Sequence, residues 1–146
     1  MVALKARARH TGLPVEQAKD QKASTFIGYL SLIGPRDGIS GDQYDAAIEF
    51  RDLRSAYLRA IKAPGAEYEP HAGGSEGEVS EEYEDWCDRT IKTYGECRKA
   101  IQEAQNASRE NLWAALDLVV IQDQRLHHMI GATRILCNSL ARFFRI

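Results

Sequence analysis

The side chains of this chain that could do chemistry are three cysteines, four histidines and a cluster of carboxylates. Cys87, Cys97 and Cys137 form neither a C-x-x-C pair nor an even set, which argues against a zinc ribbon and a disulfide framework. His127 and His128 are adjacent, so on a helix their side chains would point about 100° apart and make a poor metal pair. We therefore expect no metal site and no disulfide.

Catalysis by a thiol or a carboxylate pair is also weakly supported. The three cysteines fall on apolar stripes, where burial raises the pKa of a thiol and makes the nucleophilic thiolate scarce. The carboxylates from Glu81 to Asp85 could do acid–base work, but a solvated helix start explains the same run. Neither a phosphate-binding glycine loop nor an H-E-x-x-H zinc motif occurs. We expect a binding protein without a cofactor, and not an enzyme.

Near the C-terminus, arginine and asparagine side chains are spaced so that they could contact the bases of DNA from one face of a helix. We predict a short helix from Asp123, a corner at Gly131 and a second helix capped by Thr133, which is a helix-turn-helix-like pattern over residues 123–145. Arg and Asn side chains form paired hydrogen bonds to guanine and adenine, and Thr and Ser suit phosphate oxygens. The predicted outward face of the second helix comprises Thr133, Arg134, Asn138, Ser139 and Arg142.

Two features leave this DNA-binding face open to another interpretation. His127 is bulky where such motifs usually have a small residue, and a plain helical hairpin with a polar outside satisfies the same pattern. Cations outside the face could add contacts to phosphates. These cations are Arg125, Lys5, Arg7 and Arg9.

Charge is segregated along a chain of ordinary globular composition. The 146 residues are 44% hydrophobic and 27% charged, with a formal net charge of -2, which argues against non-specific coating of nucleic acid. No Lys or Arg occurs between Lys62 and Arg89, whereas both ends of the chain are basic. This asymmetry suits a local contact with a polyanion, although solvated charged faces produce similar sequences.

Helices are the elements that must position these side chains. Apolar residues at three- and four-residue spacing predict a first helix from Pro14 to Ile33, stopped by Gly34-Pro35. Ser40 and Gln43 form the signature of a capping box, which begins a second helix that runs to about Lys62.

The second half of the chain reads as further helices. Ser80 caps a third helix, and its apolar positions from Tyr83 to Ala104 alternate spacings of four and three, as in coiled-coil packing. Self-association through this helix is compatible with every function considered. Ser108 restarts or continues helix. The β-branched residues around Val119 make a short strand possible, but such a strand would have no evident partner.

We predict an all-α bundle of about five or six helices that ends in the helix-turn-helix-like pair. Residues 1–63 form an N-terminal helical hairpin with a basic N-terminus, 64–79 an acidic linker rich in Gly and Pro, and 80–146 a C-terminal helical region. The hairpin and the C-terminal region pack as one compact domain. Because no run of about 20 apolar residues and no signal peptide occurs, we expect a cytoplasmic protein with no membrane contact.

Parts of the chain carry a resemblance to a known group. The run from Ile39 to Ala47, the opening Lys5-Ala6-Arg7 and the ending Leu140-Ala141-Arg142-Phe143-Phe144 resemble uncharacterised phage and prophage proteins of alphaproteobacteria. The C-terminal pattern is similar to that of phage late-gene transcription regulators and, less closely, of small terminase subunits. The resemblance implies a DNA-directed regulator and assigns no individual residue.

The leading expectation is therefore a phage-type transcriptional regulator that binds duplex DNA through its C-terminal helices. One alternative is a non-enzymatic interaction module, such as a phage-encoded inhibitor or adaptor that contacts host RNA polymerase or another host protein through the acidic segment. The other is a DNA-packaging subunit of small-terminase type. A homo-oligomer is compatible with each, since dimeric DNA binders are common.

Overall fold

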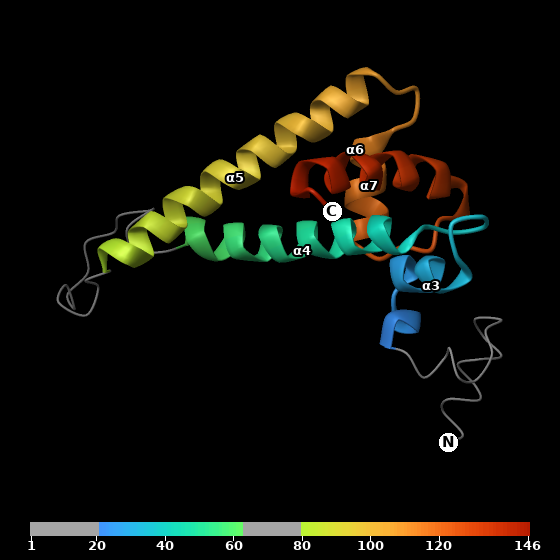
Figure 1. Ribbon diagram of the computed structural model, residues 1–146, viewed down its shortest axis with the longest axis horizontal. Coiled ribbons are helices and arrows are strands. Elements are labelled where there is room, and N and C mark those ends of the chain that lie inside the picture. The colour runs from blue at the N-terminus through green and yellow to red at the C-terminus, as the bar shows by residue number, and fades with distance from the viewer. Residues whose placement is uncertain (1–20, 63–79) are drawn as a thin grey trace.

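The computed structural model describes residues 21–62 and 80–146, and every regular element in these two ranges is helical. We predicted an all-α bundle of about five or six helices, and the all-α bundle is confirmed with about five. No helix within the described ranges is long and apolar enough to cross a membrane. In chain order the elements are η1 (Gln21–Ser24), α3 (Phe26–Ile33), α4 (Gly41–Ile61), α5 (Glu81–Asn106), α6 (Leu112–Ala114), η2 (Ala115–Ile121), η3 (His127–Met129) and α7 (Ile130–Phe144) (Figure 1).

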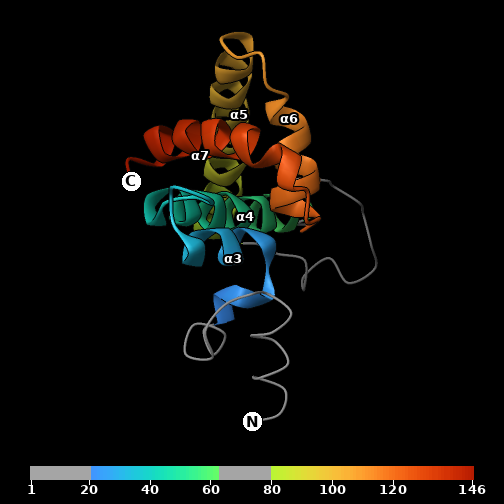
Figure 2. The same ribbon diagram turned by 90° about the vertical axis from the view of Figure 1, so that its right-hand side faces the viewer.

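The two long helices, α4 and α5, set the shape of the molecule. They meet where α4 ends and α5 begins, and from there they diverge (Figure 1). Helix α7 lies in the wedge between them and packs on both, while α3 packs on the opposite side of α4 (Figure 2). The α6–η2 segment then runs down the side of this stack and contacts α3, α4 and α7 through η2.

Side-chain caps begin the long helices where the sequence predicts them. The backbone N–H of Gln43 donates to Oγ of Ser40 at 3.1 Å, and the N–H of Ser40 donates to Oε1 of Gln43 at 2.8 Å. This confirms the capping box. Ser80 likewise accepts a hydrogen bond from the N–H of Tyr83 at 3.1 Å. Both caps satisfy donors that a helix start leaves without an intrahelical partner.

The first described helix begins later than the sequence predicts. Thr25 is the N-cap of α3, because its Oγ1 accepts a hydrogen bond from the N–H of Gly28 at 3.1 Å. A 3₁₀ turn, η1, precedes it, so the predicted helix over 14–33 is wrong for residues 21–25, and its first residues lie outside the described ranges. Gly28 allows the backbone of η1 to lie directly against α3, because a Cβ at this position would collide with the carbonyl oxygen of Lys22.

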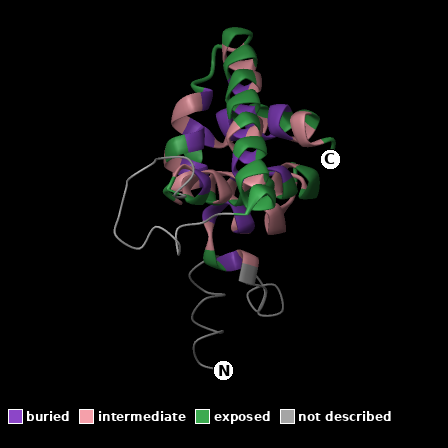
Figure 3. Cartoon of the chain, turned by 90° about the vertical axis from the view of Figure 1, so that its left-hand side faces the viewer, coloured by how far each residue is buried: buried purple, intermediate pink, exposed green. Residues whose placement is uncertain are grey.

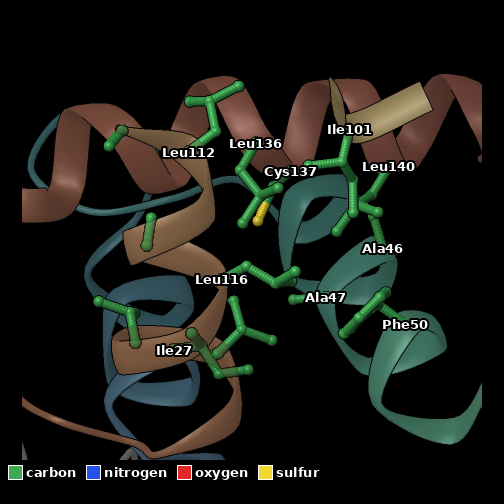
Figure 4. Packing of buried hydrophobic residues seen from close by; sticks show 14 of the residues in the cluster. Ile27, Ala46, Ala47, Phe50, Ile101, Leu112, Leu116, Leu136, Cys137 and Leu140 are labelled. Carbon is green, nitrogen blue, oxygen red and sulfur yellow. The ribbon is translucent and has the colours of Figure 1, made fainter. Parts of the chain in front are cut away.

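One hydrophobic core unites the helices before and after residues 63–79. Side chains from α3, α4, α5, α6, η2 and α7 meet in it (Figure 4). The predicted stripe of α5 is buried at Cys87, Thr90, Tyr94, Cys97 and Ile101, whereas Tyr83, at its start, is 39% exposed. A smaller cluster, built on Ala60 and Cys87, joins the ends of α4 and α5.

The chain between α5 and α7 departs from regular α-helix. Helix α5 ends at Asn106, and a new helix begins at Leu112 under Asn111, whose Oδ1 accepts the N–H of Ala114 at 3.0 Å. Ser108 therefore neither caps nor continues a helix. The next seven residues, η2, form a π-helix and not a strand. A π-helix is rare and is found frequently at functional sites.

Candidate interaction site

The predicted helix-turn-helix geometry is wrong for residues 123–145. Residues 123–126 are not helical, and Gly131 lies in the first turn of α7 and not at a corner between two helices. Asp123 does not cap a helix of its own. It adopts a left-handed backbone, with φ of 57°, and its Oδ1 accepts the backbone N–H of Phe26 at 2.7 Å. The carboxylate therefore accepts a first-turn N–H of α3, a helix that is distant in sequence and has Thr25 as its N-cap.

Two residues of the predicted DNA-reading face point into the fold. Thr133 is fully buried, and its hydroxyl donates to the carbonyl oxygen of Met129 at 2.8 Å. Ser139 is 5% exposed, and its hydroxyl donates to the carbonyl oxygen of Ala100 at 3.4 Å. Helix α7 packs on both α4 and α5, and these two hydroxyls are therefore not available to phosphate oxygens.

Arg134 is also engaged inside the molecule. Its Nε donates to the carbonyl oxygen of Gly38 at 2.6 Å, and its Nη2 donates to the carbonyl oxygen of Arg36 at 3.2 Å. The guanidinium therefore ties α7 to the loop between α3 and α4. Asn138 is exposed, but its Oδ1 accepts a hydrogen bond from Nε2 of Gln43 at 2.9 Å.

The structure describes two of the remaining predicted cations, Arg142 and Arg125. Arg142 is exposed on α7, and Arg125 is exposed in the segment before η3. The N-terminal cations Lys5, Arg7 and Arg9 lie outside the described residues. Of the predicted DNA-binding residues that the structure describes, Thr133 and Ser139 are buried and Arg134 is bonded to backbone carbonyls, so these residues do not form one free surface.

The thiols of Cys97 and Cys137 sit in surroundings that suppress their ionisation. Burial raises the pKa of Cys137 from 9.0 to about 12. Burial also raises the pKa of Cys97 to about 12, against a smaller lowering by the charge of Arg98. Within residues 21–62 and 80–146, no group of three or more His, Cys, Asp or Glu side chains could hold a metal ion. His127 packs its ring against Phe26, with centroids 5.2 Å apart.

A groove that the sequence analysis did not identify opens between α4, α5 and the α6–η2 segment. Its volume is about 710 Å³, which is within the range of protein binding sites. The π-helix η2 supplies much of one wall, so the unusual backbone and the groove coincide. We call it the arginine groove; it is lined by Arg54, Tyr94, Arg98, Asn111, Trp113, Ala114, Leu116, Asp117, Leu118 and Ile121.

Aromatic rings hold one guanidinium of the arginine groove in place. Cζ of Arg98 lies 4.7 Å from the ring centroid of Trp113 and 5.9 Å from that of Tyr94. Each ring is itself supported: Nε1 of Trp113 donates to Oε1 of Gln102 at 3.0 Å, and Tyr94 stacks on Tyr57 at 4.1 Å. A guanidinium that stacks on an aromatic face keeps its N–H donors at its edge.

Both arginines of the groove have unused donors. Within the described residues, neither Arg54 nor Arg98 donates a hydrogen bond or forms an ion pair. Asp117 also lines the groove, so its charge is mixed and not uniformly basic. The arrangement can bind a carboxylate or another oxyanion edge-on, while Leu118 and Ile121 contact an apolar part of the same ligand.

No protein-family model, no curated protein and no solved structure matches this chain. The function must therefore be inferred from the geometry of the site.

Sequence reasoning could have paired Tyr94 with Arg98, because they are four residues apart on one helix. It could not have placed Trp113 beside them, since that contact depends on the direction in which the chain returns after α5.

Proposed function

We propose that this chain is a non-enzymatic interaction module that binds an acidic, partly apolar segment of a partner protein in the arginine groove. The observation that carries the proposal is the Arg98 guanidinium, which lies over the Trp113 ring and donates no hydrogen bond to any residue that the structure describes. Charge-assisted hydrogen bonds from arginine to a carboxylate are among the strongest polar contacts that proteins form.

The composition of the groove favours a peptide over a nucleic acid. Arg54 and Arg98 are two separate cations beside an apolar wall, and Asp117 adds a negative charge to the lining. A duplex or single strand presents a dense row of phosphates, which such a carboxylate repels. A peptide helix with isolated carboxylates and apolar residues between them meets all three features, in the manner of helix-in-groove recognition.

A binding role is also favoured by the chemistry of the buried thiols. Cys97 directly precedes Arg98, which lines the groove. Burial raises the pKa of the Cys97 thiol to about 12, so a thiolate nucleophile is scarce at neutral pH. The groove instead offers fixed donors and an apolar surface, which are the requirements for recognition.

Fluorescence of Trp113 tests this proposal directly, because the chain has only two tryptophans. A Trp86→Phe protein leaves Trp113 as the only tryptophan. The probe is a synthetic helical peptide about four turns long, with Leu and Glu at three- and four-residue spacing. We expect saturable change in Trp113 emission, and about tenfold weaker binding in Arg98→Gln, equivalent to about 1.4 kcal/mol.

Three controls make the result specific. The same peptide with Lys in place of Glu should not bind, and Arg142→Gln, an exposed arginine on α7, should bind as the parent does. Equal binding of the acidic and basic peptides, or unchanged binding in Arg98→Gln, would refute the proposal. Duplex DNA forms the last arm: binding that is lost in Arg142→Gln but kept in Arg98→Gln would support the transcriptional regulator instead.

A further inference from the structure

Asp117 is acidic, whereas the charged residues that share the arginine groove with it, Arg54 and Arg98, are cations. Its side chain is exposed in the groove, and within residues 21–62 and 80–146 it forms no hydrogen bond and no ion pair. Neither arginine is paired with it, although all three residues line one cavity. The groove therefore contains one negative and two positive charges that do not neutralise one another through a direct contact.

The helix that carries Asp117 offers this carboxylate no local role. Helices α6 and η2 form one continuous helix, because Ala114 and Ala115 at their junction both have right-handed helical backbone angles. Counted from Leu112, Asp117 lies beyond the first turn, in which the helix dipole favours a carboxylate. The residues three and four positions away along the helix carry no charge; they are Trp113, Ala114, Val120 and Ile121. The carboxylate is therefore available to a ligand in the groove.

The wall that carries Asp117 also carries the aromatic ring that supports Arg98. Asp117 follows Trp113 by four residues, which is about one helical turn, and the Trp113 ring centroid lies 4.7 Å from Cζ of Arg98. Leu118 and Ile121 continue the same wall with apolar side chains. Figure 3 shows the α6–η2 segment beside α5, whose outward face is exposed along most of its length. A ligand in the groove therefore meets a cation and, about one helical turn further along, a carboxylate.

We infer that the partner helix in the arginine groove carries a lysine or arginine three or four residues from a carboxylate, and that Asp117 selects this cation. The inference rests on the proposed function, because it names the ligand chemistry of the same groove. Side chains three and four residues apart share one face of a helix, which matches the spacing of about one turn between the two charges of the wall. The ligand carboxylate then bonds to Arg98 while its cation pairs with Asp117. A purely acidic helix instead places like charge near Asp117, which is unfavourable.

Two helical peptides of identical composition test the inference, with Trp113 fluorescence of the Trp86→Phe protein as the readout. Both are about four turns long and present the same Leu and Glu residues on one face. In the first peptide, a Lys on that face lies four residues from a Glu on either side, so either direction of the helix can bring it to Asp117. In the second, this Lys exchanges places with a Gln on the opposite face. We expect the parent protein to bind the first peptide about fivefold more tightly, and this preference to shrink at high salt.

Variants of Asp117 show whether the carboxylate causes the preference. Asp117→Asn should bind the two peptides equally, and should bind the second at least as tightly as the parent does, since it loses a charge that repels the ligand carboxylates. Asp117→Glu keeps the charge and should keep the preference. Glu103→Gln is the matched control, because Glu103 is an exposed acid of α5 that does not line the groove. It should keep the preference as well.

The outcomes separate this inference from the proposed function. Arg98→Gln should weaken binding of both peptides about tenfold and leave the preference between them in place. Equal binding of the two peptides to the parent, with both weakened by Arg98→Gln, overturns the inference and leaves the proposed function standing. A preference that survives in Asp117→Asn, or an Asp117→Asn protein that binds both peptides more weakly by the same factor, also overturns the inference. A parent protein that binds neither peptide overturns the proposed function, and the inference with it.

Discussion

Replacing Asp123 with alanine should destabilise the fold more than its position in a surface loop suggests. Oδ1 of Asp123 accepts the N–H of Phe26 at 2.7 Å, and Phe26 is fully buried at the first position of α3. A first-turn N–H has no partner within its own helix, and α3 has only eight residues, which is too short to be stable alone. The carboxylate therefore positions a helix that lies on the far side of α4 from α7.

The size of the effect follows from two contributions. A hydrogen bond to a charged acceptor contributes about 1.5–3 kcal/mol. Asp123 also has a φ of 57°, a conformation that Asp tolerates better than Ala, so Asp123→Ala adds strain of about 1 kcal/mol. The expected loss in the free energy of unfolding is therefore about 2.5–4 kcal/mol. Asp123→Asn keeps an acceptor and tolerates the same φ, and should lose only about 1 kcal/mol.

Urea unfolding followed by circular dichroism measures these differences, provided that the variants have equal m values. Gln124→Ala is the matched control, since Gln124 is exposed and its Nε2 bonds only to the neighbouring Gln122 side chain. The reasoning is refuted if Asp123→Ala differs from the parent by no more than the control does. It is also refuted if Asp123→Asn is as destabilised as Asp123→Ala.

The same unfolding assay checks three other predictions. Gly28→Ala should cost about 2–3 kcal/mol, because its Cβ would collide with the backbone of η1; a neutral result would mean that η1 moves freely. Arg134→Ala should cost about 1–3 kcal/mol through two lost hydrogen bonds to backbone carbonyls, whereas Arg142→Ala, being exposed, should stay within about 0.5 kcal/mol. Burial raises the pKa of the thiols of Cys97 and Cys137 from 9.0 to about 12. The contribution of these protonated thiols to the free energy of unfolding is therefore complete below about pH 9 and is lost as the pH rises toward 12. Urea midpoints of the parent should therefore fall between pH 8 and pH 10.5 more steeply than those of a double alanine variant; equal slopes would contradict the assignment.

Sequence determined the elements whose signals lie within one or two helical turns. Ser40 with Gln43, and Ser80 with Tyr83, begin α4 and α5 where predicted, because a cap joins a side chain to a backbone three residues away. The buried stripe of α5 is equally local, since its period alone decides which side chains share a face. The all-α class follows from such signals added along the chain.

The tertiary structure alone decided what the C-terminal segment does. Asp123 looked like a local cap, but its carboxylate bonds to Phe26, 97 residues away in sequence, so the helix predicted after it does not form. Helix α7 lies between α4 and α5, and this packing buries Thr133 and Ser139. The pattern of an amphipathic surface helix instead predicts that both residues face the solvent.

The arginine groove likewise depends on contacts between elements that the chain separates. Arg54, Arg98 and Trp113 come from α4, α5 and α6, and only the packing of the three brings their side chains to one cavity. Local periodicity places each residue on a face of its own helix, but the direction in which neighbouring helices cross depends on the fit of all their side chains together. That fit is a property of the folded core, and for this reason a single helical pattern could not reveal it.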